Sequence, residues 1–108
     1  MRLYHNPRCS KSRQALALLE LRNIEFEEYR YLEKGVSQED LEILVQLEGV
    51  IRANDLDPDC EFNLNSKTDL RKLLESNSKV LQRPILVNDG KAVIGRPPEE
   101  ILTLLPDA

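Results

Sequence analysis

The stretch HNPRCSKSR, residues 5–13, contains the only histidine of the chain, one of its two cysteines and three basic side chains. The preceding RLY, residues 2–4, is a short candidate strand, and Asn6-Pro7 is a turn signal. The following SKSRQALALLELRN, residues 10–23, repeats apolar side chains at helical spacing. The sequence therefore predicts a strand, a tight turn and a helix, with Cys9 immediately before the first helical residue.

Cys9 is predicted to be a reactive thiolate. A thiol at a helix N-terminus lies close to unpaired backbone N–H groups and to the positive end of the helix dipole. Arg8, Lys11 and Arg13 add positive charge, and such surroundings lower the pKa of a thiol from about 8.5 to roughly 3.5–7.5. His5 adds a hydrogen-bond donor, or a positive charge when protonated. The alternative, a buried and inert cysteine, fits poorly because the stretch is almost wholly polar.

Ser12 stands where a C-x-x-C motif would have its second thiol. Cys9 can form a covalent adduct, but an external thiol or the distant Cys60 must then complete the cycle. Ser12 supports the chemistry in one interpretation and is only a helix N-terminal residue in the other. Cys60 could be a resolving thiol, a metal ligand or a small semi-buried residue. We favour the last, because no cysteine or histidine lies near it in the sequence.

Turn signals and apolar periodicity divide the rest of the chain into alternating elements. Ser37 with Asp40 resembles a capping box that opens a helix, and Asp89-Gly90 is a strong hairpin signal. The stretch 50–65 has no clean period and is interpreted as irregular or as a short helical turn. The expected elements are a strand at 24–32, helices at 37–49 and 67–78, strands at 85–87 and 91–95, and a helix at 97–105.

Composition limits the classes of function that the chain can serve. Its 108 residues fit one domain spanning 1–108, and a net charge of −4 argues against nucleic acid or an anionic membrane as the main partner. No apolar run approaches the roughly 18 residues needed to cross a bilayer, and the N-terminus has no apolar signal-peptide core. No Cys/His spacing resembles a metal site. We therefore expect a cytoplasmic protein without a bound metal or organic cofactor, and a monomer.

The order of the predicted elements resembles a known fold. Strand, helix and strand, then a helical insertion, then strand, strand and helix, with a cysteine at the first strand-to-helix junction, resembles the thioredoxin-like α/β fold, in which helices flank a small mixed sheet. Three segments, YHNPRCSKSR (4–13), LQRPILV (81–87) and GKAVIGRPPEEIL (90–102), resemble the signature segments of the glutaredoxin-coupled arsenate reductase family. The resemblance covers nearly the whole chain and is weakest at 50–65.

The resemblance implies roles for several further residues. Pro84 would be the cis-proline that faces the cysteine, and Arg83 and Arg96 would hold an oxyanion beside it. A guanidinium suits this task because its planar fork donates two parallel hydrogen bonds, and the alternative is two arginines that only face solvent. The family has a third arginine in the helical insertion, where this chain has only Arg52. That segment is short, and four acidic residues nearby would repel an anion: Asp55, Asp57, Asp59 and Glu61.

The function that the resemblance implies is reduction of arsenate. Cys9 would attack arsenic, glutathione as co-substrate would attack next, and glutaredoxin would resolve the mixed disulfide as arsenite leaves. One alternative is a general thiol–disulfide or deglutathionylating enzyme, in which the arginines bind a glutathione carboxylate. The other is a non-enzymatic redox regulator that binds RNA polymerase. Such regulators typically carry C-x-x-C, so Ser12 counts against that possibility.

Overall fold

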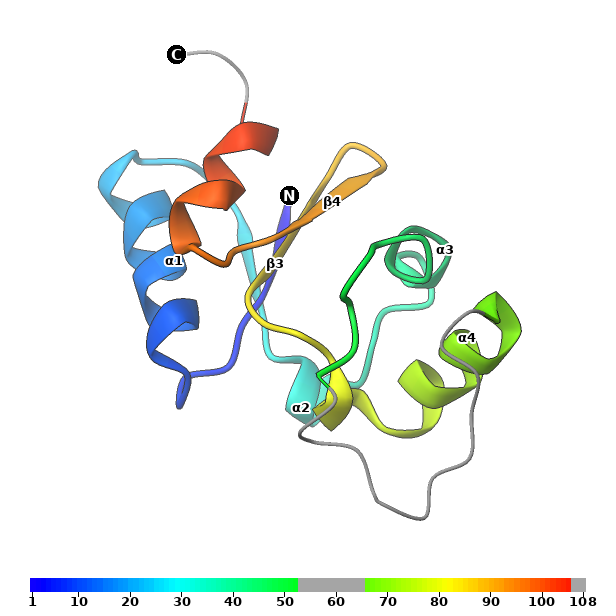
Figure 1. Ribbon diagram of the computed structural model, residues 1–108. Coiled ribbons are helices and arrows are strands. Elements are labelled where there is room, and N and C mark those ends of the chain that lie inside the picture. The colour runs from blue at the N-terminus through cyan, green and yellow to red at the C-terminus, as the bar shows by residue number, and fades with distance from the viewer. Residues whose placement is uncertain (53–65, 106–108) are drawn as a thin grey trace.

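A four-stranded mixed sheet forms the centre of the molecule (Figure 1). The computed structural model describes residues 1–52 and 66–105. Within them the strands follow the order β2-β1-β3-β4, with β1 parallel to β2 and antiparallel to β3, and β3 antiparallel to β4. The strands are β1 (Arg2–Tyr4), β2 (Glu27–Tyr29), β3 (Ile85–Asn88) and β4 (Lys91–Ile94). This arrangement confirms the predicted small mixed sheet and the thioredoxin-like order of elements.

Two helices cover one face of the sheet. The helix α1 (Ser10–Leu21) follows β1, and the 3₁₀ helix η3 (Pro98–Leu104) follows β4 (Figure 1). Successive side chains of a strand point to opposite faces, so the sheet contributes alternate residues to this layer. The buried core between helices and sheet consists of Leu3, Ala15, Leu19, Leu86 and Ile101.

The opposite face carries the helical insertion (Figure 1). It comprises α2 (Tyr31–Lys34), α3 (Leu41–Leu44), α4 (Lys67–Ser76) and the 3₁₀ turn η2 (Ser78–Val80). Tyr4, Ile85 and Val87 are the buried strand residues of this larger core, and Tyr29, Ala92 and Ile94 pack against it. No helix in residues 1–52 or 66–105 is long and apolar enough to cross a membrane.

The strand expected at 24–32 is shorter than predicted. The edge strand β2 pairs only with β1, from Arg2 opposite Glu27 to Tyr4 opposite Tyr29. Because β1 has three residues, β2 has no partner beyond Tyr29. The chain then turns into α2, which places Tyr31 fully in the core.

The helix expected at 37–49 is also shorter, since α3 spans only Leu41–Leu44. Ser37 and Asp40 do not form a capping box. The backbone N–H of Ser37 donates to the Tyr4 hydroxyl at 3.2 Å, and the carboxylate of Asp40 turns away from the helix toward β1. The Ser37 N–H and the Asp40 carboxylate, which the local pattern predicts to form a cap, therefore make tertiary hydrogen bonds instead.

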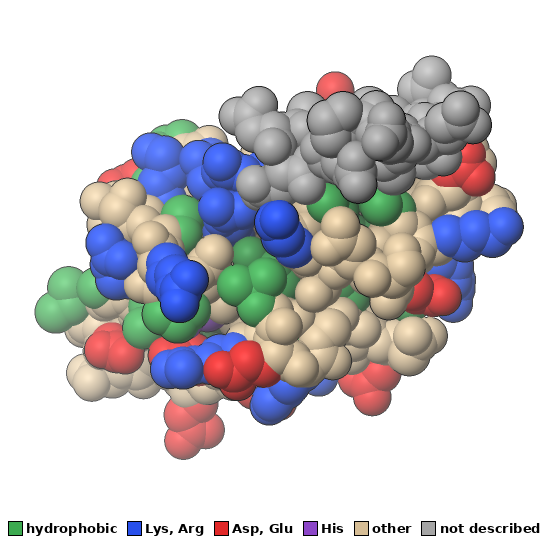
Figure 2. Space-filling view, turned by 90° about the horizontal axis from the view of Figure 1, so that it is seen from below, with side chains coloured by type: hydrophobic (Ala, Val, Ile, Leu, Met, Phe, Trp, Pro, Cys, Tyr) green, Lys and Arg blue, Asp and Glu red, His purple; other side chains and the backbone are tan. Residues whose placement is uncertain are grey.

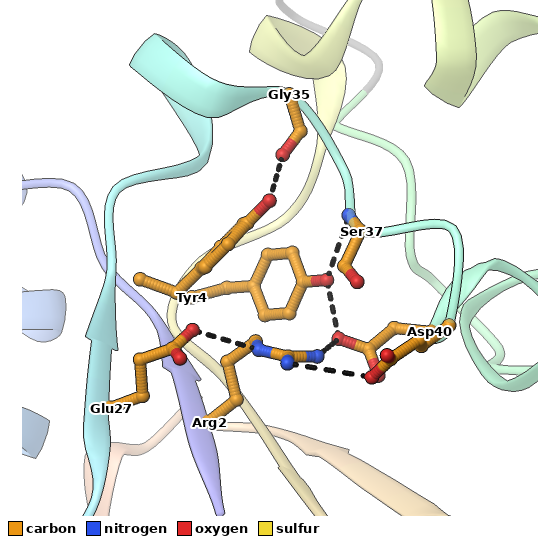
Figure 3. A network of polar contacts seen from close by, with 8 residues as sticks. Arg2, Tyr4, Glu27, Gly35, Ser37 and Asp40 are labelled. Carbon is orange, nitrogen blue, oxygen red and sulfur yellow. Dashed lines mark hydrogen bonds and ion pairs between the residues drawn. The ribbon is translucent and has the colours of Figure 1, made fainter.

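The Asp40 carboxylate is the centre of a polar network that fastens this insertion to the sheet (Figure 3). Asp40 is 4% exposed, and it accepts hydrogen bonds from the Tyr4 hydroxyl and from Arg2 Nη1, each at 2.6 Å. Arg2 also donates through Nε to Glu27 at 3.0 Å. The hydrogen bond to Asp40 raises the pKa of Arg2, so the guanidinium stays charged. A buried carboxylate with two strong donors is stabilising only as long as all partners remain.

We expect Asp40→Asn to destabilise the protein by about 1–3 kcal/mol, because a partly buried guanidinium contact and a buried hydroxyl contact lose their charged acceptor. Urea unfolding monitored by circular dichroism measures the effect. Glu39→Gln is the matched control: Glu39 lies 3.6 Å from Arg2 but its side chain is 82% exposed, so its loss should change stability by less than about 1 kcal/mol. Equal effects for the two variants would contradict the assigned role of Asp40.

Candidate active site

Cys9 occupies the N-cap position of α1, at the junction with β1. The turn between them is organised by Asn6, whose backbone carbonyl accepts the N–H of Cys9 and whose side-chain oxygen accepts the N–H of Arg8, each at 3.0 Å. Cys9 itself has extended backbone angles (φ −95°, ψ 122°) and makes no side-chain cap. Its sulfur is therefore available at the positive end of the helix dipole, as the sequence predicts.

Opposing effects act on the Cys9 thiol, and the net result is a lowered pKa. Partial burial raises the pKa of Cys9. The effect of burial is outweighed by hydrogen bonds that stabilise the thiolate. Their donors are the backbone N–H of Ser12, the Arg83 guanidinium and the backbone N–H of Lys11. The basic side chains adjacent in sequence are not among these causes. The charge that lowers the pKa comes from the distant Arg83.

Arg83 precedes β3 and Arg96 follows β4, so both lie at the open end of the β3–β4 hairpin, where they meet at Cys9. Arg96 Nη2 lies 3.8 Å from the Cys9 sulfur, and Arg96 Nε donates to the backbone carbonyl of Arg83 at 2.9 Å. The Arg83–Pro84 peptide bond is cis, as the resemblance implies, and so is the Arg96–Pro97 bond. The arrangement brings two guanidinium groups to the Cys9 sulfur, although both arginines lie more than 70 residues from Cys9 in the chain.

Gly95 allows the close approach between these two arginine segments. Its N–H donates to the carbonyl of Pro84 at 2.8 Å. A Cβ at this position would lie 2.7 Å from Pro84 Cγ and 3.0 Å from Ile101 Cγ2, which is too close for either contact. A side chain would thus push Pro84 or η3 away and move both arginines. Sequence reasoning did not single out Gly95, because a glycine after a strand has many possible causes.

His5 and Ser12 form a buried pair behind the cysteine. His5 Nδ1 lies 2.7 Å from the Ser12 hydroxyl oxygen, which also accepts the N–H of Asn6 at 2.9 Å. Burial lowers the pKa of His5, so its ring is neutral at neutral pH and does not supply the positive charge considered from the sequence. Ser12 is fully buried and connects the turn to α1. It therefore has more than the minimal role of a helix N-terminal residue.

We expect His5→Ala to raise the pKa of Cys9 and to slow turnover without abolishing it. The effect is indirect, because His5 positions Ser12. Without the imidazole ring, the Ser12 hydroxyl loses a hydrogen-bond partner, and the Ser12 N–H that stabilises the thiolate is held less firmly. Ser12→Ala should shift the thiol pKa in the same direction. Alkylation rates as a function of pH report that pKa. Complete loss of activity with an unchanged thiol pKa would show instead that His5 contacts the substrate.

Arg52 follows an isolated bridge between Ile51 and Leu81. Its backbone N–H donates to the Val80 carbonyl at 2.7 Å, so it lies on the segment beside the one that leads into Arg83. Cys60 and the four acidic residues at 55, 57, 59 and 61 lie outside the described residues. Within the described ranges, no group of three or more His, Cys, Asp or Glu side chains could hold a metal ion.

A pocket of about 630 Å³ is lined by residues of the turn that precedes Cys9 and by Arg83, whose side chain hydrogen-bonds the Cys9 thiol. Arg8, next to Cys9 in sequence, and the distant Arg83 line one side of it, and residues of α2 and η2 supply the other. Lys and Arg side chains gather on this face around exposed hydrophobic side chains (Figure 2). Arg30 and Lys79 also line the pocket. Neither could be predicted from the sequence, because two isolated basic residues form no recognisable pattern.

These features define the class of protein. A cysteine with a lowered pKa between β1 and α1, a cis-proline segment beside it and the sheet order β2-β1-β3-β4 are those of a thiol protein with a thioredoxin-like fold. Residues 4–104 match the ArsC family, and the chain belongs to that family. The match confirms the family expected from the three sequence segments.

Individual relatives agree with this assignment. The chain is 39% identical to an arsenate reductase of Haemophilus influenzae, over 95% of this chain and 97% of that protein. It is 40% identical to YfgD of Escherichia coli K12, over 97% of this chain and 96% of that protein, a relative whose name states no activity. The solved structure of an arsenate reductase from Vibrio cholerae has a TM-score of 0.78 at 35% identity, covering 97% of this chain and 98% of that one.

Proposed function

We propose that the protein is an oxidoreductase of the cytoplasm that reduces arsenate, with glutathione as co-substrate and glutaredoxin as the partner that completes the cycle. The observation that carries the proposal is the meeting of Cys9 with Arg83 and Arg96. Names of relatives support arsenate as the substrate. No resident metal or organic cofactor is required by the chemistry below.

The first task of the site is to bring an anion to an anionic nucleophile. Arsenate and the Cys9 thiolate repel one another, and in a partly buried site this repulsion would dominate without compensation. Arg83 and Arg96 supply two positive charges beside the sulfur. Their planar forks can donate paired hydrogen bonds to the oxygens of a tetrahedral anion. Arg52 is proposed as a secondary ligand, because its backbone runs beside residues 80–82.

The second task is covalent capture. The Cys9 sulfur attacks arsenic and forms an S–As(V) bond, and a hydroxyl group leaves arsenic, takes up a proton and departs as water. A thiolate attacks readily at neutral pH because its pKa is lowered. The guanidinium groups stabilise the charge that develops on the arsenate oxygens as the bond forms.

The third task is reduction by an external thiol. The thiolate of glutathione attacks the Cys9 sulfur and forms a disulfide bond with it, while the electron pair of the S–As bond passes to arsenic. Arsenic changes from As(V) to As(III) and leaves as arsenite. The thiolate of glutaredoxin then attacks the glutathione sulfur of the mixed disulfide, and Cys9 departs as a thiolate. Ser12 has no thiol and cannot perform this last step, so in the proposed cycle the thiol of glutaredoxin performs it.

The proposal is tested by following arsenite release with purified protein, arsenate, glutathione and glutaredoxin. Omitting glutaredoxin should leave the protein trapped with one glutathione on Cys9, detectable by mass spectrometry. The proposal would be wrong if arsenite were not formed under conditions in which the Cys9 thiol is intact and reactive.

The second candidate is a thiol–disulfide or deglutathionylating enzyme acting on glutathione-containing disulfides. The cationic pocket near Cys9 also supports this candidate, because such an enzyme needs a site for glutathione. If the protein releases no arsenite but rapidly reduces glutathione mixed disulfides, it is a deglutathionylating enzyme. The third possibility, a regulator that binds RNA polymerase, is supported by one relative named as a regulatory protein, MgsR of Bacillus subtilis, which is 33% identical over 94% of this chain. Ser12 in place of a second thiol counts against it.

A further inference from the structure

The pocket beside Cys9 has a distinctive distribution of charge. It is lined by four cationic side chains and one acidic side chain: Arg8, Arg30, Lys79, Arg83 and Glu33. This excess of positive charge contrasts with the net charge of −4 for the whole chain. A concave surface of one sign attracts and holds ligands of the other sign.

The pocket is larger than an oxyanion requires. Its volume of about 630 Å³ lies within the range of roughly 300–1,000 Å³ that small-molecule sites occupy. Pro7 and Leu32 supply apolar surface between the charges. Arg83 both lines this pocket and stabilises the Cys9 thiolate. A molecule seated here would therefore lie between the turn that leads to Cys9 and the residues of α2 and η2, with Arg83 linking the pocket to the sulfur.

We propose that this pocket is the glutathione subsite, and the proposal rests on the function given above. Glutathione carries a carboxylate at each end. An ammonium group lies beside the carboxylate of the γ-glutamyl end. The pocket offers cations for both carboxylates and a single carboxylate for the ammonium group. The thiol in the middle of glutathione is then delivered to Cys9.

The positions of the charged residues suggest the orientation. Arg30 and Glu33 are neighbours at the start of α2, where the N–H of Glu33 donates to the carbonyl of Arg30 at 3.1 Å. Together they match the adjacent carboxylate and ammonium of the γ-glutamyl end. Lys79 in η2 then receives the glycine carboxylate. Arg30 also pairs with Glu28 at 3.3 Å, but an exposed pair of this kind is weak enough to be exchanged for a ligand.

The test measures how fast Cys9 reacts with glutathione disulfide, in a Cys60→Ser background so that Cys9 is the only thiol. Cys9 attacks one sulfur of the disulfide, and one glutathione leaves as a thiolate, giving the same mixed disulfide as in the proposed cycle. The neutral reagent 2-hydroxyethyl disulfide reports the reactivity of the thiol alone. The Arg30→Ala/Lys79→Ala variant should react about fivefold or more slowly with glutathione disulfide at low salt, and at an unchanged rate with the neutral reagent.

Two further variants separate a specific site from general attraction. Lys67→Ala/Lys91→Ala removes the same amount of charge from exposed positions outside the pocket, and it should leave both rates close to those of the parent protein. Glu33→Gln removes a negative charge, so general attraction predicts a faster reaction with glutathione disulfide. Pairing of Glu33 with the ammonium group predicts a slower one.

Equal rates for the pocket variant and its control, or a faster reaction of Glu33→Gln, would overturn the glutathione subsite. Neither arsenate nor glutaredoxin takes part in this measurement. If the parent protein releases no arsenite but the pocket variant still slows only the reaction with glutathione disulfide, arsenate reduction is rejected. The glutathione subsite is then retained.

Discussion

Cys9→Ser should abolish arsenate reduction, lowering the rate by roughly a thousandfold or more, because a serine hydroxyl at this position is neither ionised nor able to form a disulfide. Cys60→Ser should retain activity. Arsenite release in the presence of glutathione and glutaredoxin measures both variants. Retained activity in Cys9→Ser would exclude the covalent route through S–As(V).

The same pair of variants tests the thiol pKa. A lowered pKa means that the thiolate is already populated below the usual range of about 8–9, and its fraction falls as pH drops through the lowered value. The alkylation rate of the protein that keeps only Cys9 should therefore reach its plateau at a lower pH than that of the protein that keeps only Cys60. A faster reaction of the Cys60 thiol at pH 6 would mean that Cys9 is not the activated cysteine.

Arg83→Ala and Arg96→Ala should each weaken oxyanion binding by about tenfold or more. A charge-assisted hydrogen bond contributes on the order of 1.5–3 kcal/mol, and 1.4 kcal/mol corresponds to a factor of ten. Calorimetric titration of arsenate or sulfate into Cys9→Ser proteins measures binding without the covalent step, and without the effect of Arg83 on the thiol. Lysine should not rescue either position, because it supplies a point charge in place of a fork.

Arg52→Ala should cost less than either of these substitutions, and Arg71→Ala is the neutral control. Arg71 lies on α4 and pairs with Glu42 and Glu75, so it is engaged elsewhere. Unchanged affinity in both Arg83→Ala and Arg96→Ala would remove the oxyanion site from the mechanism and favour the glutathione-handling alternative.

The fold was predictable where a local pattern and a tertiary contact agree. Asp89 and Gly90 form the expected turn with positive φ values of 55° and 78°, which a tight hairpin requires. The predictions were wrong where a contact from a distant strand competed with a local one. Asp40 binds Arg2 and Tyr4 instead of capping α3, and β2 ends because its partner strand ends.

The candidate site was predictable in part for a related reason. Cys9, His5 and Ser12 lie in one short stretch, so their spacing alone indicates that they meet. Arg83 and Arg96 were found only through the resemblance to a family, because nothing local shows that two separate arginines face one sulfur. Arg30 and Lys79 have neither kind of signal. Their association is a property of the surface that α2 and η2 form together.

The hairpin that carries Arg83 and Arg96 also has a consequence for engineering. Both arginines lie at its open end, and β3 and β4 are held in register from Ile85 opposite Ile94 to Asn88 opposite Lys91. The spacing of the two guanidinium groups is thus set by the ladder and not by the turn at the far end. A peptide tag or a fluorescent amino acid inserted between Asp89 and Gly90, both exposed, should report on the protein in living cells while leaving the anion-binding geometry intact.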